Sequence, residues 1–466
     1  MLFIQRMHTF VTTVTVTTVT DIKQLIMRFY NREEELKELK RIQQLAFEEN
    51  SRMTVVTGRR RIGKTSLIMK AVEQSPTVYL FVGRKNEATL CEEFIPLITQ
   101  SLQTFVPGEI RSFRNLFQYL MQLATQQAFN LVIDEFQEFY NINESIFSDM
   151  QNIWDQHRKS SHMNLIVSGS IYSLMQKIFQ DNKEPLFGRA DNIIKLSAFS
   201  LPVLKEIMHE YAPAHSNDDL LALYTFTGGV PKYVELFCDN HALSVESMIH
   251  FMVRDNSPFT EEGKNLLVEE FGKNYGTYFS ILSAIAGGRN TQAEIEATLG
   301  EKSIGGYLKR LIDDYNIIIR QRPILAKEGS TTVRYEICDN FIRLWFNYFD
   351  RNRSLIEIKN FVGLRTIIET DYPTYSGKIL ELYFKQKFAE SYQFRAIGSW
   401  WEAKGNLNEI DIVALRLEKN KAIVAEVKRQ HKNFKPELLA QKVEHLKKKL
   451  LPRYSIETMC LSLEDM

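Results

Sequence analysis

The sequence predicts an α/β protein: a phosphate-binding core on a parallel sheet, a largely helical middle, and a smaller α/β region at the C-terminal end. Two patterns predict the core. A β-branched strand at 53–57 runs into a glycine-rich loop and a helix, and a second apolar strand at 129–134 ends in carboxylates. A third pattern, Asp411 followed by Glu426-x-Lys428 on two expected strands, predicts the C-terminal region. The 466 residues leave room for about three domains at roughly 150 residues each.

Composition limits the function. Hydrophobic residues make up 44% and charged residues 25% of the chain, values that exclude a fibrous or wholly disordered protein. No stretch approaches the ~18 apolar residues of a membrane span, so no membrane association is expected. The four cysteines form no CxxC pair, which argues against a zinc site or a disulfide framework and favours a cytoplasmic protein. Residues 1–26, rich in Thr and Val, are predicted to be a disordered extension ahead of a domain that begins at Met27.

The loop after the first strand carries the signature of a nucleotide phosphate site. It reads Gly58-x-x-x-x-Gly63-Lys64-Thr65 between a strand and a helix, the context that this motif, the Walker A loop, requires. Its backbone N–H groups are expected to face a polyphosphate together with the positive end of the helix. Lys64 is predicted to reach the β- and γ-phosphates of ATP, and the Thr65 hydroxyl to hold Mg²⁺. The predicted nucleotide contacts are Gly58, Arg59, Arg60, Arg61, Ile62, Gly63, Lys64, Thr65 and Ser66.

The second strand and its neighbour supply catalytic candidates. The run FNLVIDE ends in Asp134, predicted to bind the Mg²⁺, and Glu135, predicted to polarise the attacking water. A further apolar strand, NLIV, is followed by Ser168 and Ser170, whose hydroxyls are either γ-phosphate sensors or N-caps of the next helix. Arg189 is either a finger that stabilises transition-state charge or an ordinary surface arginine.

Several short motifs together resemble the archaeal-type ATPase family, which sits among the AAA+ and STAND P-loop ATPases. They are FYNREEEL, GRRRIGKTS, IDEFQ, SGS, PLFGR and TGGVPKY, spread over about residues 27–240. The resemblance implies a P-loop NTPase fold that binds ATP with Mg²⁺. It also implies that Asn31 and Arg32 lie near the adenine, and that GGVPKY begins a helical lid over the nucleotide.

The middle of the chain has the pattern of a winged helix-turn-helix. Three short helices are expected, the second with a capping box at Thr291 and Glu294, followed by two β-like runs and an aromatic segment that reads as core. The third helix offers only Lys309 and Arg310 for reading bases, so DNA contact and inter-domain packing are equal alternatives. The predicted domains are a P-loop ATPase core at 27–200, a helical lid at 201–270, the winged helix at 271–350 and a nuclease-like domain at 351–466.

Four charged residues near the C-terminus form a pattern typical of metal-dependent nucleases. A predicted helix carries Glu381, and strand pairing is expected to place Asp411 beside Glu426 and Lys428. Carboxylates holding a divalent cation, with a lysine that positions water, carry out phosphodiester hydrolysis. The pattern resembles the PD-(D/E)xK restriction-endonuclease-like fold and, through GSWW and AEVKR, the domain of unknown function that accompanies archaeal-type ATPases. The alternatives are a chance hairpin pattern and a fold that has lost cleavage.

The formal charge of +1 hides a basic segment. From Arg416 to Arg453, twelve Lys or Arg stand against four Glu, a local net of +8 that suggests contact with DNA phosphates, with a solvated helix face as the alternative. The sequence therefore predicts an ATP-hydrolysing P-loop ATPase coupled to a nuclease-like domain that acts on DNA. The alternative is a nucleotide-dependent regulatory switch whose inactive nuclease fold binds nucleic acid or protein. A homo-oligomer is compatible with either prediction.

Overall fold

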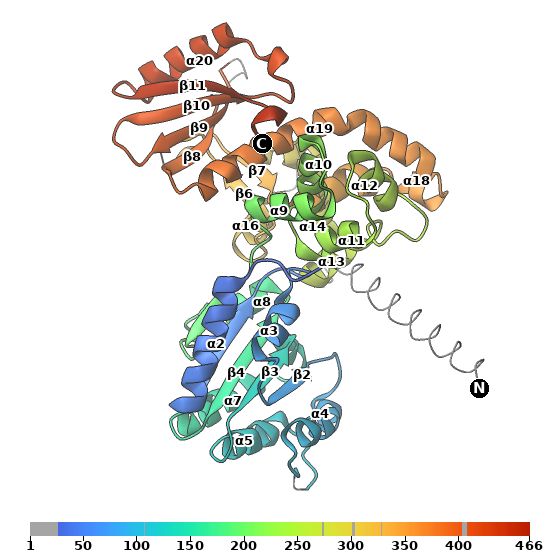
Figure 1. The fold of residues 1–466 in the computed structure, drawn as a ribbon, viewed down its shortest axis with the longest axis vertical. Helices are drawn as coiled ribbons and strands as arrows, with labels where there is room; N and C mark the ends of the chain where they lie inside the picture. The colour runs from blue at the N-terminus through green and yellow to red at the C-terminus, as the bar shows by residue number, and fades with distance from the viewer. Residues whose placement is uncertain (1–26, 107, 273–274, 301–302, 328, 403–407) are drawn as a thin grey trace, which may run out of the picture. The chain divides into compact units, whose positions relative to one another are not determined.

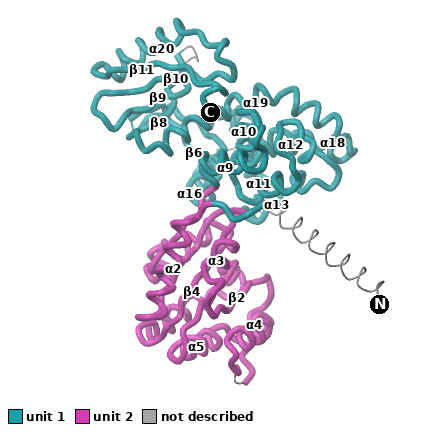
Figure 2. The backbone as a smooth tube through the Cα atoms, in the orientation of Figure 1, with its two compact units in different colours: residues 1–30, 199–466 teal, residues 31–198 magenta. Residues whose placement is uncertain are grey.

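The computed structural model describes residues 27–106, 108–272, 275–300, 303–327, 329–402 and 408–466 (Figure 1). The chain divides into two units, Asn31–Ala198 and Phe199–Met466, and the described residues before Asn31 belong to the second (Figure 2). The extension predicted at 1–26 lies outside the described residues. No helix within the described ranges is both long and apolar enough to span a membrane.

The unit formed by Asn31–Ala198 is a parallel sheet with helices on both faces. Its strands follow the order β2-β3-β4-β1-β5, and every neighbouring pair is parallel. The strands are β1 (Arg52–Thr57), β2 (Thr77–Phe81), β3 (Phe129–Asp134), β4 (Met163–Gly169) and β5 (Asn192–Lys195). The helices are α2 (Glu33–Glu48), α3 (Lys64–Val72), α4 (Glu87–Leu102), α5 (Phe113–Leu123), η1 (Phe136–Glu138), α6 (Phe139–Ile142), α7 (Ser145–His157) and α8 (Tyr172–Gln180).

Successive residues of strand β1 point into different apolar clusters. Val55 packs in the cluster that contains Phe94 of α4 and Phe113 of α5. Val56 packs in the cluster that contains Leu39 of α2 and Leu67 of α3. Because both faces of the sheet are covered, its strands read as continuous apolar runs rather than alternating ones.

The second unit begins with a group of helices and continues with three helices and a hairpin at the place where the winged helix was predicted. The first group is α9 (Leu201–Tyr211), α10 (Asn217–Thr227), α11 (Pro231–Asp239), α12 (Val245–Met252) and α13 (Glu262–Phe271). The next elements are α14 (Tyr275–Ala286), α15 (Gln292–Thr298), α16 (Gly305–Asp313), β6 (Ile318–Gln321) and β7 (Arg334–Ile337), of which β6 and β7 pair antiparallel. The predicted capping box is confirmed, because the Thr291 side chain accepts from the Glu294 N–H and the Glu294 carboxylate bonds back.

The aromatic segment after β7 is core, as predicted. Phe341, Trp345, Phe346 and Phe349 are all buried. They lie on α17 (Asn340–Leu344) and on η3, a π-helix over Trp345–Asp350, before α18 (Arg353–Glu357) and the long helix α19 (Phe361–Glu390).

The C-terminal sheet lies between helices α19 and α20. Its order is β11-β10-β9-β8, with β10 and β11 parallel and the other pairs antiparallel. Its elements are β8 (Phe394–Trp400), β9 (Ile410–Arg416), β10 (Lys421–Val427), η4 (His431–Asn433), α20 (Pro436–Lys449), β11 (Ser455–Leu461) and η5 (Leu463–Asp465). Val424 packs with Leu439 and Val443 of α20, whereas Ala425 packs in the cluster that includes Ile379 of α19. The sheet is therefore covered on both faces.

Candidate nucleotide site and carboxylate cluster

The loop between β1 and α3 turns through residues in the left-handed region. Arg61 and Gly63 have φ of 68° and 89°. Gly58 has a φ of 152°, and a Cβ there would lie 2.9 Å from the Leu196 carbonyl oxygen, so a side chain does not fit. Alternating backbone handedness aims successive N–H groups into one concavity, which is how anion nests form. Ile62 is buried beneath the loop, so its side chain supports the turn.

Lys64 opens helix α3 and folds back over the loop. Its ammonium group donates to the carbonyls of Gly58 at 3.0 Å and Arg59 at 3.2 Å. The side chain is buried, with 7% of its residue surface exposed. The cation is thus held at the concavity formed by the loop.

Asp134 receives donors from two neighbouring strands, from the loop helix and from the residue that follows it. The Thr65 hydroxyl donates to its Oδ2 at 2.9 Å, and Tyr79 of β2 donates to the same oxygen at 2.7 Å. Ser168 of β4, the strand between β1 and β3, donates to Oδ1, as does the N–H of Glu135 at 3.0 Å. Burial acts to raise the pKa of Asp134, but its hydrogen bonds outweigh burial and hold that pKa below its usual range.

Glu135 leaves the end of β3 with a φ of 54°, which turns its side chain away from the strand direction. Its carboxylate accepts from the Ser170 hydroxyl at 2.7 Å and from the Gln137 amide. Neither serine caps helix α8, because Ile171 occupies the N-cap position and caps with no side chain. The N-cap alternative for Ser168 and Ser170 is therefore wrong, and their hydroxyls orient the two carboxylates instead.

Asn31 and Arg32 precede helix α2 with φ of 58° and 81°. The Arg32 guanidinium is buried, lies 3.3 Å from Glu35 and donates to the Ser197 carbonyl. The turn is thereby fixed to the end of the same unit.

The structure does not bring Arg189 to the loop of its own chain. Its guanidinium donates to the Phe187 carbonyl at 2.9 Å and to Asp155 at 3.1 Å. Two residues on, the N–H of Asp191 donates to the Met53 carbonyl at the start of β1, whereas the loop follows the end of that strand. The strand rises on the order of 13 Å between these points. Arg189 therefore lies at the opposite edge of the sheet from the loop of its own chain, because β5 pairs beside β1, and its role as a finger stays a prediction.

The second group of candidates lies on the hairpin of β9 and β10. Their register places Ala425 opposite Ile412, so Glu426 stands opposite Asp411. Asp411 Oδ2 accepts the Val427 N–H at 2.8 Å and lies 3.9 Å from the Lys428 ammonium. Lys428 donates to Glu426 at 2.9 Å.

Helix α20 contributes a lysine that the sequence analysis missed. Lys442 lies 3.1 Å from Glu426 Oε2, so two ammonium groups hold this carboxylate. Its neighbour Gln441 is exposed. Because α20 carries several lysines, the sequence alone does not indicate which of them points toward the sheet.

Glu381 lies on α19, and its pKa depends on the charge of Asp411 in the cluster. Burial, and next the charge of Asp411, raise the pKa of Glu381 to about 7. Burial and the nearby Glu426 charge also raise the pKa of Asp411, against the Val427 N–H and Lys428, which act to lower it. In the part of the chain that the structure describes, however, no three His, Cys, Asp or Glu residues are grouped so that they could hold a metal ion.

Half of the Lys and Arg side chains in the basic segment, residues 416–453, form ion pairs with carboxylates. The paired cations are Arg416 with Glu457, Lys421 with Glu418, Lys428 and Lys442 with Glu426, Arg429 with Asp218 and Lys449 with Glu402. Among the described residues, six have no ion pair: Lys419, Lys432, Lys435, Lys447, Lys448 and Arg453. The surface left for an anion is therefore smaller than the net of +8 suggested.

The glycine-rich loop forms an anion nest on a five-strand parallel sheet, and Asp134 and Glu135 stand at the end of β3. These features define a P-loop ATPase. A family model described as an ATPase domain predominantly from Archaea matches residues 29–237, and one for archaeal and bacterial proteins of unknown function matches residues 345–444. An uncharacterized protein of Methanocaldococcus jannaschii, MJECL04, is 30% identical over 418 residues, 86% of this chain and 87% of its own. The chain belongs to this family of predominantly archaeal ATPases.

Two solved structures are similar to this chain. The Walker-type ATPase PABY2304 of Pyrococcus abyssi is 19% identical with a TM-score of 0.50, over 68% of this chain and 96% of that one. The ORC2 protein of Aeropyrum pernix, solved as ADPNP and ADP complexes, is 13% identical with a TM-score of 0.47, over 72% of this chain and 96% of that one. The first of these similarities supports the fold of the nucleotide unit.

Proposed function

We propose that the chain hydrolyses ATP in the unit formed by Asn31–Ala198. Lys64 and the loop N–H groups bind the phosphates, Thr65 and Asp134 hold Mg²⁺, and Glu135 orients the attacking water. The hydrogen bond of 2.9 Å between Thr65 and Asp134 carries this proposal, because it sets side by side two oxygen ligands that Mg²⁺ prefers. The cation would supply neutralisation of the phosphate charge.

The hydrogen bonds around the two carboxylates suggest how the site works. Ser168 and Tyr79 keep Asp134 oriented when the Thr65 hydroxyl turns to the cation. Ser170 holds Glu135 in the same way. We therefore assign both serines as positioning residues that act through the carboxylates, not as direct sensors of the phosphate.

Three further assignments rest on family resemblance and on the position of Arg189. We place the adenine beside Asn31 and Arg32 and the helical lid at 201–270. Arg189 is remote from its own loop, so a role as a finger requires a second copy of the chain, which makes a homo-oligomer part of this proposal.

We further propose that the C-terminal sheet is a PD-(D/E)xK nuclease-like domain that acts on DNA. Asp411 and Glu426 face one another across the hairpin and offer carboxylate oxygens for a divalent cation, with Lys428 to position water. The assignment adds Glu381 as a third carboxylate because its charge interacts with that of Asp411, although the described residues are not grouped as a ready-made metal site. The unpaired lysines of the basic segment would contact phosphates.

The alternative function, a regulatory switch with an inactive nuclease fold, is favoured by one specific observation. Both oxygens of Glu426 are contacted by ammonium groups, from Lys428 and Lys442, which occupy the place of a cation. In this version the domain binds nucleic acid or protein without cleaving. We assign the winged-helix candidate to packing, because Leu308 and Leu311 of α16 lie in the core shared with α19.

A cleavage assay separates the two versions. The full chain is incubated with DNA, Mg²⁺ or Mn²⁺, and ATP, beside Asp411→Ala and the control Glu457→Ala, which removes a surface carboxylate of the same sheet. Metal-dependent cleavage that Asp411→Ala abolishes and Glu457→Ala retains supports the nuclease. Absence of cleavage with either metal, while DNA binding persists, leaves the switch.

A further inference from the structure

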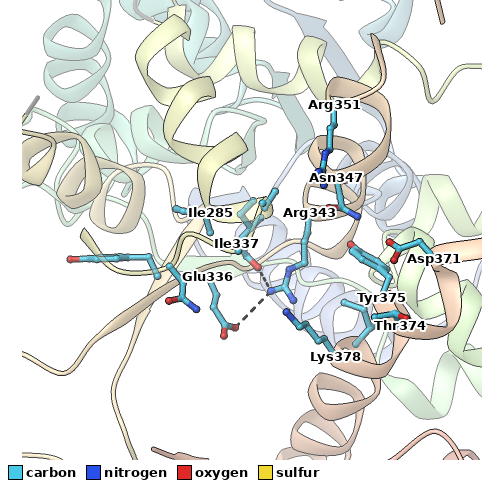
Figure 3. A pocket seen from close by; sticks show the side chains of 16 residues that line it. Ile285, Glu336, Ile337, Arg343, Asn347, Arg351, Asp371, Thr374, Tyr375 and Lys378 are labelled. Carbon is cyan, nitrogen blue, oxygen red and sulfur yellow. Dashed lines mark hydrogen bonds and ion pairs between the residues drawn. The ribbon is translucent and has the colours of Figure 1, made fainter. Parts of the chain in front are cut away.

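A cavity of about 290 Å³ lies within the second unit (Figure 3). It is lined by the end of α14, by β7, by the π-helix η3 and by α19. None of its lining residues is among the predicted site residues. A π-helix in a cavity wall is a common mark of a functional site.

Three basic side chains reach the cavity from different elements (Figure 3). Lys378 and Arg351 are exposed and make no hydrogen bond or ion pair with any described residue. Arg343 donates to the Ile337 carbonyl and lies 3.9 Å from Glu336. Two cations in the wall are therefore available to a ligand.

The two acidic residues of the wall are already engaged. Asp371 accepts the Tyr348 hydroxyl at 2.7 Å, and Glu336 accepts the Gln321 amide at 2.8 Å. Neither is paired with the two available cations. The wall therefore carries three cations against two carboxylates, a net charge of +1, and its two unpaired cations favour an anion as the ligand.

Tyr375 adds a donor that has no acceptor. Its hydroxyl oxygen is buried, and no described residue offers it a hydrogen bond, while its ring packs edge-on against Tyr348 at 5.2 Å. Buried hydroxyls are nearly always satisfied, so this one points to a ligand that supplies an oxygen. Ile285, Ile337 and Ile379 form an apolar part of the wall.

We propose that this cavity binds the phosphate of a nucleotide, with Arg351 and Lys378 as its counter-charges and the Tyr375 hydroxyl as a neutral donor. The apolar wall accommodates the sugar or base, in the usual mixture of an apolar pocket with few convergent polar groups. The phosphate belongs either to a free nucleotide or to a nucleic-acid strand.

The position of the cavity connects it to the carboxylate cluster. Lys378 precedes Glu381 by three residues on α19, which places both on one side of the helix. Glu336 of the cavity wall also contributes to the electrostatic surroundings of Glu381. A nucleic-acid phosphate bound in the cavity would hold the strand beside that cluster. This role rests on the proposed nuclease function, whereas the proposal that the cavity binds phosphate does not depend on it.

Calorimetry on the full chain, with its P-loop saturated by ADP, tests the inference. The probes are thymidine, thymidine 5′-monophosphate, and short oligothymidylate with and without a 5′-phosphate. For each pair that binds, we expect the phosphorylated probe to bind at least tenfold more tightly than its unphosphorylated counterpart. This ratio corresponds to about 1.4 kcal/mol of binding free energy. Lys378→Ala and Arg351→Ala should each remove this preference. Arg365→Ala, on the same helix and outside the cavity wall, should keep it.

Tyr375→Phe separates recognition from folding. Because the hydroxyl has no hydrogen-bond partner among the described residues, its removal should leave the melting temperature unchanged or raised while it weakens the binding of the phosphorylated probes. Preference for the mononucleotide assigns the cavity to free nucleotides, and preference for the phosphorylated strand assigns it to nucleic acid; both support phosphate recognition. Equal binding with and without phosphate, or a preference that survives Lys378→Ala and Arg351→Ala, overturns it. Phosphate recognition without DNA cleavage would retain this site and remove the nuclease.

Discussion

Arg429 follows the lysine of the carboxylate cluster and ties the C-terminal sheet to helix α10. Its guanidinium donates to Asp218 at 2.8 Å and to the Ser376 hydroxyl, and lies 5.2 Å from the centre of the Tyr372 ring. The Arg429 and Asp218 side chains are 18% and 32% exposed. Breaking a fully buried pair costs about 3–5 kcal/mol, so with this exposure we expect Arg429→Ala to lower the free energy of unfolding by about 2 kcal/mol.

A double-mutant cycle measures that contact directly. Asp218→Asn should cost about as much as Arg429→Ala, and the double variant little more than either, which gives a coupling energy of about 1–2 kcal/mol. Urea unfolding at neutral pH supplies the free energies. Arg416→Ala, which breaks a more exposed ion pair with Glu457 in the same sheet, serves as the control and should cost less than about 1 kcal/mol. Additive costs, with a coupling energy below about 0.3 kcal/mol, would refute the claim that this ion pair joins the sheet to α10.

Three other substitutions test local contacts. Tyr79→Phe should raise the pKa of Asp134 and destabilise the fold by about 1.5 kcal/mol in urea unfolding, because a donor to a carboxylate is lost. Hydrogen bonds, above all the one from Lys449, lower the pKa of Glu402 from 4.5 to about 2. The ionised Glu402 therefore stabilises the fold fully above pH 4.5, and this stabilisation is lost as the pH falls toward 2. Glu402→Gln should therefore be less stable than the parent at pH 7, by under about 1 kcal/mol for this partly exposed group, and equal to it at low pH. Gly263→Ala should lower the melting temperature, since its Cβ would meet the Trp345 ring, an overpacking that costs about 1–3 kcal/mol.

Each of these expectations has a contrary outcome. A Tyr79→Phe protein as stable as the parent would mean that the hydroxyl adds nothing to Asp134. A stability gap for Glu402→Gln that does not change with pH would remove the assigned pKa shift. An unchanged melting temperature for Gly263→Ala would show that the ring has room to move.

The nucleotide loop was predictable because its chemistry is contiguous in the chain. Strand, loop and helix follow one another from β1 to α3, so Lys64 and Thr65 could be placed without knowledge of the rest of the fold. Asp134 and Glu135 were predictable for the same reason, as the end of one apolar strand. The aromatic segment could be assigned to the core, but its π-helical turn could not, because the same spacing suits an α-helix.

Residues whose roles depend on distant elements were missed or could not be placed. Tyr79 reaches Asp134 across 55 positions of sequence, because β2 pairs beside β3. Lys442 meets Glu426 only because α20 packs on that face of the sheet. The sequence left the position of Arg189 open, and the pairing of β5 with β1 puts it at the edge of the sheet opposite the loop.

The central claim is that Asp134 and Glu135 make this loop a site of ATP hydrolysis. Steady-state turnover of Mg²⁺-ATP by the wild type and by Glu135→Gln, with ATP binding measured in parallel, tests it most directly. The wild type should hydrolyse ATP, and Glu135→Gln should bind ATP as well while its turnover falls at least about 100-fold, the loss expected of a residue that orients the attacking water. Equal turnover in the two proteins, or no ATP binding by the wild type, would contradict the claim.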